Sequence, residues 1–320
     1  PGGESTVTTD TLTRDVSRYR NVALFLFLAA VWGSAFMAIK AGVEFIPPVL
    51  FAALRYDIAG VLMLGYAVVA VDDWYPTTRA GWTEVVIGGV FMIAAYHALL
   101  FVGETGPVSS AAAAVLVALS PVLTTAFARL LLPEEPVTAT TWLGMGLALV
   151  GVVVLMNPDP ERLLTDAVVS KSLVFGAAAA FALGSVLTRR VNGDLRIETM
   201  EAWSMLLGAG LMHAVSVAMP SESFAMVEWN ATALLALAYL AVAASAVGFL
   251  VYFDLLDRLG PVEINMVSYV APVFAALSGW LVLGEALTPA TVVGFLVIFV
   301  GFVVVKRRAV AREVELLQSS

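Results

Sequence analysis

Histidine is the side chain best suited to moving a proton near neutral pH, and this chain has two, His97 and His213. His97 lies in the middle of an apolar segment, and Glu104 follows at i+7 on the same helical face. Because histidine titrates near neutrality, this pair could couple a proton or another ion, although we favour a hydrogen-bonded packing role for His97. His213 has no evident partner. With two separated histidines and no cysteine, we expect neither a metal site nor a cofactor.

Arg55 is a charge inside another apolar segment. At the centre of a membrane such a charge costs roughly 2.5–3.5 kcal/mol on insertion scales, and less toward the ends. A partner is therefore expected. Glu104 lies at a suitable depth, whereas Asp57 at i+2 points away from Arg55. We favour a structural ion pair, and the alternative is that Arg55 attracts an anionic group of a substrate.

A polar face recurs on the segment 261–283, where residues at i, i+3, i+4 and i+7 are Asn265, Ser268, Tyr269 and Pro272. Polar faces of membrane helices point toward the protein interior. These side chains could bind a substrate or could hydrogen-bond between helices. The pattern leaves both interpretations open.

Two prolines, Pro121 and Pro272, lie near the middle of apolar segments. A proline inside a helix removes one backbone hydrogen bond and frees the carbonyl four residues earlier, here those of Val117 and Ser268. The freed carbonyl can belong to a hinge that also contacts the substrate, or to a static kink relieved by a neighbouring hydroxyl. We favour hinges, because both prolines occupy equivalent places.

Tryptophan rings can stack on a planar substrate. Trp32, Trp203 and Trp280 lie within or near segments expected to line a cavity, whereas Trp74, Trp82 and Trp229 lie at segment ends, where interface anchors occur. The alternative for the first three is that they face lipid.

The composition shows which elements must hold these residues. The chain of 320 residues is 60% apolar and 13% charged, with a mean hydropathy of +0.93, whereas soluble domains are about 45–50% apolar and about 25% charged. We therefore expect an all-α integral membrane protein. Its net charge of −8 argues against a nucleic-acid partner. Ten apolar segments are long enough to cross a bilayer: 21–43, 48–71, 81–103, 107–131, 138–156, 171–190, 199–219, 230–257, 261–283 and 288–305.

Most of the 17 Lys and Arg residues fall in segments that share one side when the N-terminus is cytoplasmic. We therefore expect cytoplasmic tails at 1–20 and 306–320 and an extracellular linker at 157–170. The protein would be a multi-pass protein of the plasma membrane.

The sequence also resembles itself at a shift of about 151 residues. Each half, 21–156 and 171–305, contains five spans, and because five is odd the halves would be inverted repeats. Inverted repeats are typical of secondary transporters, whose substrate sites lie at the repeat interface. The matched positions are Gly33-Ser34 with Gly184-Ser185, Pro121 with Pro272, Leu132-x-Glu134 with Leu283-x-Glu285 and, after a one-residue slip, Gly144 and Gly151 with Gly294 and Gly301.

Several of these positions form motifs of a known family. Trp32-Gly33-Ser34-x-Phe36, Pro47-Pro48 followed by Arg55, Ser120-Pro121 and the duplicated Leu-x-Glu resemble, in order and spacing, the EamA-like branch of the drug/metabolite transporter superfamily. The resemblance covers nearly the whole chain. It implies ten helices around a central cavity and export or exchange of small metabolites by alternating access. The motif serines Ser34, Ser120 and Ser185 complete the candidate substrate-binding set with Trp32, Arg55, His97, Trp203, Asn265, Ser268 and Tyr269.

We therefore expect a secondary transporter of small organic metabolites. Few deep charges line the inner segments, which favours amphipathic or aromatic substrates over phosphorylated sugars. The alternative is a membrane-embedded enzyme acting on a lipid-soluble substrate, but no cluster of catalytic groups is visible. We interpret Glu134 and Glu285 as caps of the helices that follow them.

Overall fold

The computed structural model describes residues 4–132, 139–157, 165–260 and 264–319, and all regular structure in these ranges is helical. The first half contains α1 (Glu4–Gly42), α2 (Pro48–Ala70), α3 (Arg79–Ile87), η1 (Gly88–Ala95), α4 (Tyr96–Glu104), α5 (Ser110–Val117), α6 (Ser120–Leu131) and α7 (Ala139–Met156). The second half contains α8 (Asp166–Val191), α9 (Ile197–Ala218), η2 (Phe224–Met226), α10 (Ala231–Ala238), η3 (Tyr239–Val247), α11 (Gly248–Leu259), α13 (Val267–Leu283) and α14 (Pro289–Ser319).

Within the described ranges these elements form ten rods, one for each predicted span. Six rods are long and apolar enough to cross a membrane, and three shorter apolar helices lie within α7, α13 and α14. The helix α9 completes the set. Two helices run further than predicted, because α1 begins at Glu4 and α14 continues to Ser319.

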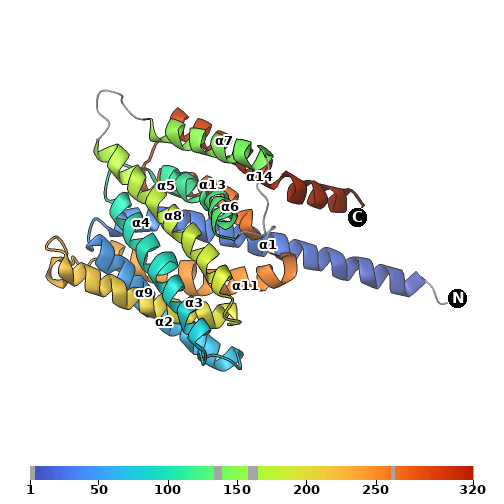
Figure 1. The fold of residues 1–320 in the computed structure, drawn as a ribbon, viewed down its shortest axis with the longest axis horizontal. Helices are drawn as coiled ribbons and strands as arrows, with labels where there is room; N and C mark the ends of the chain where they lie inside the picture. The colour runs from blue at the N-terminus through green and yellow to red at the C-terminus, as the bar shows by residue number, and fades with distance from the viewer. Residues whose placement is uncertain (1–3, 133–138, 158–164, 261–263, 320) are drawn as a thin grey trace.

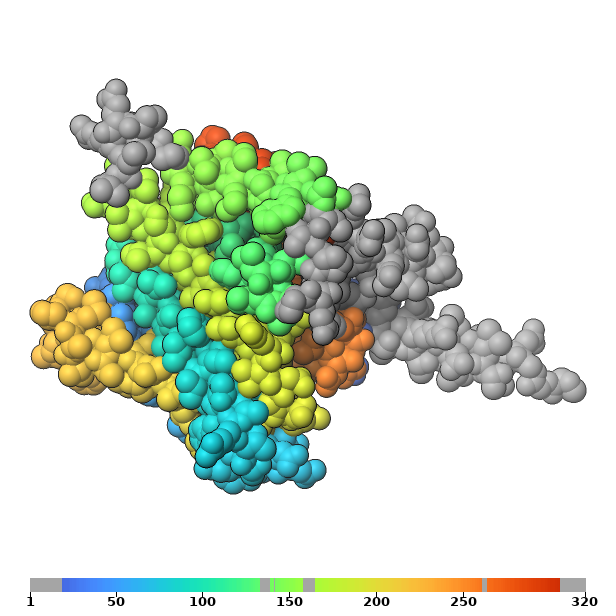
Figure 2. Space-filling view, viewed as in Figure 1, coloured from blue at the N-terminus to red at the C-terminus, as the bar shows by residue number. Residues whose placement is uncertain are grey.

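The neighbours of each helix follow the internal repeat. The helix α2 packs on its counterpart α9, and α7 packs on its counterpart α14. The contacts of α1 and α8 also follow the repeat. The helix α1 packs on α13, and its counterpart α8 packs on α5 and α6, which together correspond to α13. Figure 1 shows α7 and α14 side by side at one edge of the bundle, and Figure 2 shows α7 covering that side.

The contact between α7 and α14 shows how the halves are related. A Cβ added at Gly144 would lie 2.7 Å from the carbonyl oxygen of Gly301, and one added at Gly151 would lie 2.8 Å from that of Gly294. Residues early in α7 thus meet residues late in α14, so the helices are antiparallel. Because Gly144 corresponds to Gly294 and Gly151 to Gly301, each contact maps onto the other. The predicted inversion of the repeats is therefore present in the packing, and small residues permit the close approach.

The third and eighth rods each contain a π-helical stretch that the sequence analysis did not predict. These stretches, η1 (Gly88–Ala95) and η3 (Tyr239–Val247), occupy matching positions at the shift of the repeat. Such stretches are rare and frequently lie at functional sites, because they alter which side chains and carbonyls face a neighbour.

Candidate functional site

Two polar groups of η3, the Ala244 carbonyl and the Tyr239 hydroxyl, contact α1 of the first repeat. The Trp32 indole donates to the Ala244 carbonyl at 3.1 Å. The Ser34 and Tyr239 hydroxyls lie 2.7 Å apart, and Tyr239 also donates to the Val31 carbonyl at 3.1 Å. Side chains predicted from the first repeat therefore meet a segment of the second repeat that sequence patterns did not single out.

Aromatic rings line one side of this contact. The Trp32 ring lies 5.8 Å from Phe249 and 5.5 Å from Tyr252, measured between ring centroids. Both partners belong to α11, directly after η3. Gly248 permits the approach, because a Cβ there would lie 2.8 Å from the Trp32 indole nitrogen.

Arg55 also points to η3, and its predicted pairing with Glu104 is wrong. Its side chain is 6% exposed, and Nε donates to the Ser245 hydroxyl at 2.9 Å. The ion pairs found among the described residues do not include Arg55. The pairing fails because the position of Arg55 around the axis of α2 turns its side chain toward the eighth rod. Its guanidinium therefore lies buried between the repeats, where the Ser245 hydroxyl is its hydrogen-bond partner and the centroid of the Tyr56 ring lies 5.1 Å from Cζ.

His97 has a partner on each ring nitrogen. Nδ1 lies 2.9 Å from the Ile93 carbonyl, and Nε2 lies 2.7 Å from the Tyr56 hydroxyl. Because a carbonyl only accepts, Nδ1 donates to Ile93, while Nε2 shares a hydrogen bond with the Tyr56 hydroxyl, which can donate or accept. The geometry is that of a hydrogen-bonded packing histidine. Contrary to expectation, His213 does have a partner, since its Nε2 lies 2.7 Å from Asp57.

The remaining predicted residues do not join Trp32 and Arg55. Trp203 donates to the Trp74 carbonyl at 2.9 Å and packs in a group of rings with Tyr75 and Trp82. Tyr269 packs on Phe302 of α14 at 4.3 Å between centroids.

The other polar residues of the predicted face in the ninth rod differ in exposure. Asn265 is exposed and Ser268 is half-buried. The spacing of the four residues could not predict which of them is buried, because burial depends on the helices that pack against that face.

The two proline segments differ. The helix breaks before Pro121, where α5 ends at Val117 and α6 begins at Ser120, and the Ser120 hydroxyl donates to the Val117 carbonyl at 2.7 Å. By contrast, α13 runs through Pro272 without interruption. Ser185 lies half-buried in α8, beside Gly184, which packs on η1.

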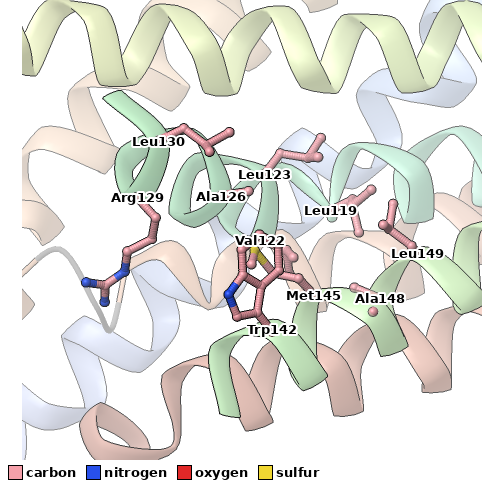
Figure 3. A pocket seen from close by; sticks show the side chains of 11 residues that line it. Leu119, Val122, Leu123, Ala126, Arg129, Leu130, Trp142, Met145, Ala148 and Leu149 are labelled. Carbon is pink, nitrogen blue, oxygen red and sulfur yellow. The ribbon is translucent and has the colours of Figure 1, made fainter. Parts of the chain in front are cut away.

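A cavity lies elsewhere in the described part of the chain. It encloses about 240 Å³ between α6 and α7, where Trp142 and Met145 point toward Val122 (Figure 3). Its wall is mostly apolar and includes exposed Trp142, Leu130 and Leu149. This cavity is lateral, whereas the sequence analysis expected a central one.

Two carboxylates cap helices of the opposite repeat. Glu222 accepts from the backbone nitrogens of Val49 and Leu50, each at 2.8 Å, at the start of α2. Glu285 accepts from the Ser110 nitrogen at 2.9 Å, at the start of α5. The prediction that Glu285 caps the following helix is therefore wrong, because the free amides of a helix across the repeat interface lie closer. Glu134 lies outside the described residues.

Sequence reasoning missed Tyr239, Ser245 and Glu222. Tyr239 and Ser245 are single polar residues in the long apolar run 230–257, and only the π-helical geometry directs them to Ser34 and Arg55. Glu222 lies in a loop, where acidic residues are common, so its residue type did not identify it as a functional residue.

Comparison with known proteins agrees with this architecture. The model of the EamA-like transporter family matches residues 20–157 and again 170–307. An Escherichia coli K12 protein named "Uncharacterized inner membrane transporter YedA" is 28% identical over 266 residues, covering 83% of each chain. An "Uncharacterized transporter" of Archaeoglobus fulgidus is 28% identical over 280 residues, covering 87% of this chain and 95% of that one.

Two further matches are more distant. A "Probable amino-acid metabolite efflux pump" of Salmonella typhimurium is 24% identical over 287 residues, covering 87% of this chain and 92% of that one. A solved structure described as "Crystal structure of protein" shares the fold, with a TM-score of 0.62 and 23% identity over 91% of this chain and 99% of that chain. With both halves matched by one family model, the chain is a multi-pass membrane transporter rather than an enzyme, and it belongs to the EamA-like transporter family.

Proposed function

We propose that this protein is a secondary transporter that exports or exchanges small amphipathic or aromatic metabolites across the plasma membrane by alternating access. The observation that carries the proposal is the buried contact between η3 and the first repeat. There Trp32, Ser34 and Arg55 from one repeat meet Tyr239 and Ser245 from the other. Substrate sites of inverted-repeat transporters lie at such an interface.

The chemistry of this contact supports a substrate with a planar apolar part and an anionic group. The rings of Trp32, Phe249 and Tyr252 offer apolar faces. Arg55 has a buried guanidinium that hydrogen-bonds to the Ser245 hydroxyl and has no ion pair among the described residues, so a carboxylate could replace Ser245 and pair with it. An amino acid with an aromatic side chain has both parts, and the Salmonella relative is named as an amino-acid metabolite pump.

His97, Ser120 and Ser185 stay candidates for the edge of this site. In the present conformation the side chains of Trp32, Ser34 and Arg55 hydrogen-bond to protein groups. A substrate must therefore displace these contacts, which places its entry in a conformation with the repeats moved apart.

We also propose that both termini are cytoplasmic, with 157–170 outside and the two five-helix units at 21–156 and 171–305. The bias of Lys and Arg toward one side supports this orientation. The rings of Trp74, Tyr75, Trp82 and Trp203 support only the position of a membrane interface. These rings gather where α3 begins, as an aromatic interface belt would.

The test is transport by the purified protein in liposomes. Vesicles loaded with unlabelled phenylalanine should accumulate external labelled phenylalanine by exchange, and Arg55→Gln should abolish this. The matched control is Arg258→Gln, which removes an arginine paired on the surface with Asp254 and should transport normally. If a panel of amino acids, aromatic amines and aromatic acids showed no exchange in the wild-type protein, the proposed substrate class would be wrong.

A further inference from the structure

Glu104 is a buried carboxylate for which the contacts described above provide no role. It ends α4, its side chain is 1% exposed, and both carboxylate oxygens lack a hydrogen-bond partner within the described chain. Buried polar groups are nearly always hydrogen-bonded. An unpartnered carboxylate in a membrane protein is therefore a candidate functional group.

Three charged groups act electrostatically on Glu104: Lys40 of α1, Arg55 of α2 and Glu285 after α13. Lys40 donates to the carbonyls of Gly106 and Val108 and lies 4.0 Å from Glu285. Arg55 donates to Ser245. Both nearby cations are thus bound to other groups.

The remaining faces of α4 add no cation. On the α8 side the neighbours of Gly103 are Ser170 and Val174, and Lys171 points instead to the Leu155 carbonyl at 2.8 Å. On α4 itself the titratable groups are Tyr96 and His97, and the described partners of His97 are Ile93 and Tyr56 of α2.

This arrangement favours the neutral carboxylic acid. An ionised carboxylate without a partner in the interior costs several kcal/mol, whereas protonation removes most of that cost. No group of three or more His, Asp or Glu residues that could hold a metal ion occurs in the described ranges. A proton needs only one carboxylate oxygen to bind, so it is the cation that the proposal takes.

We propose that Glu104 is the proton-binding site that couples an inward proton gradient to substrate export. The inference rests on the proposed transport function. In the present conformation one oxygen of Glu104 carries the proton. In the other conformation Lys40 or Arg55 is freed from its present partner and faces the carboxylate, and the proton then leaves to water.

The neighbouring contacts give this exchange a physical route. Lys40 holds the connection between α4 and α5 through two carbonyls, and Glu285 holds the first turn of α5. These contacts close the end of α4 over Glu104. When they separate, the carboxylate meets water and the Lys40 ammonium becomes available as its partner.

The first test reads protonation without any substrate. Difference infrared spectra of the protein in liposomes should show a protonated-carboxyl band that fades as pH is raised. Glu104→Gln should remove the component of the band that Glu104 contributes, whereas a component from the buried carboxyl of Glu201 should remain. The matched control Glu44→Gln, at an exposed carboxylate just beyond α1, should keep both components. A wild-type protein without this band, or with a band that does not change with pH, would overturn the proposal even if Glu104→Gln failed to fold.

The second test reads coupling, with labelled phenylalanine as the probe. For one proton exchanged per substrate, each pH unit across the membrane should support about a tenfold substrate gradient. Glu104→Gln should still exchange phenylalanine but build no gradient, and Glu44→Gln should behave as the wild type. Unaltered gradients in Glu104→Gln, or gradients driven by sodium in place of protons, would refute the role of Glu104 and leave the transport function standing. Absence of any exchange would refute the proposed substrate class, while the infrared result would still decide the protonation of Glu104.

Discussion

The fourth and ninth rods have matching sequences and different structures. Ser120-Pro121 stands at a break between α5 and α6, whereas Ala271-Pro272 lies inside the continuous helix α13. The third and eighth rods, by contrast, have π-helical stretches at matching positions. The two repeats therefore share one conformation in one pair of rods and adopt two conformations in the other.

Alternating access by inverted repeats requires the two repeats to have different conformations at any one time. If the repeats exchange conformations, α5 and α6 would join into one helix while α13 breaks at Pro272. Part of the difference has a chemical cause, because the Ser120 hydroxyl satisfies the Val117 carbonyl at the break and Ala271 has no hydroxyl to do the same. We propose that the two prolines are hinges, and that the present structure holds them in different states.

The largest expected effect is that of replacing Pro272 by alanine. A proline inside a helix costs about 3 kcal/mol, so Pro272→Ala should stabilise the continuous form of α13 by up to that amount. Exchange of phenylalanine should then slow by up to about 100-fold, with a smaller change in binding. Pro121→Ala should instead favour the exchanged conformation, because Pro121 now lies in the first turn of α6, where proline is tolerated, and would lie inside a continuous helix after the exchange. Equal rates for both variants and the wild type would make the prolines static kinks.

The matched glycines of α1 and α8 should respond unequally to alanine. A Cβ at Gly33 would collide with the Ala271 carbonyl of α13, which is backbone, whereas one at Gly184 would lie 2.8 Å from the flexible Met92 side chain and from the Phe91 Cβ. Overpacking costs about 1–3 kcal/mol, and Gly33→Ala should be at the upper end. Thermal unfolding in detergent measures this, and a larger loss for Gly184→Ala would contradict the assigned contacts.

The smallest expected effect is that of Ser120→Ala. Losing the hydrogen bond to Val117 should destabilise the present conformation by about 1 kcal/mol. Ala271→Ser should have the opposite consequence for the exchanged conformation, because it provides the missing hydroxyl. Calorimetric unfolding of both variants and of the double variant checks this. If Ser120→Ala unfolded at the wild-type temperature, the hydroxyl would not stabilise the break.

The sequence predicted the architecture well, for physical reasons. A bilayer requires long apolar segments, and the ten predicted spans each correspond to a rod. Duplicated motifs predicted the inversion that the packing of Gly144 on Gly301 shows.

The candidate site was harder to predict. Trp32, Ser34 and Arg55 do come together, but their partners Tyr239, Ala244 and Ser245 depend on a π-helical stretch that leaves no periodic signature. Pairings between distant residues failed in the same way. Arg55 binds Ser245 instead of Glu104, because depth along a helix does not determine which neighbour it faces.

The central claim is that the two repeats exchange conformations, and distances at the two ends of the bundle test it most directly. The chain has no cysteine, so spin labels can be attached at introduced cysteines without background. One pair replaces exposed Glu44 and Leu287, and the other replaces exposed Arg190 and Asp257. We expect two distances for each pair, with phenylalanine and a pH gradient lengthening one pair as the other shortens. A single distance at either end, or parallel changes at both, would contradict alternating access by exchange of the repeats.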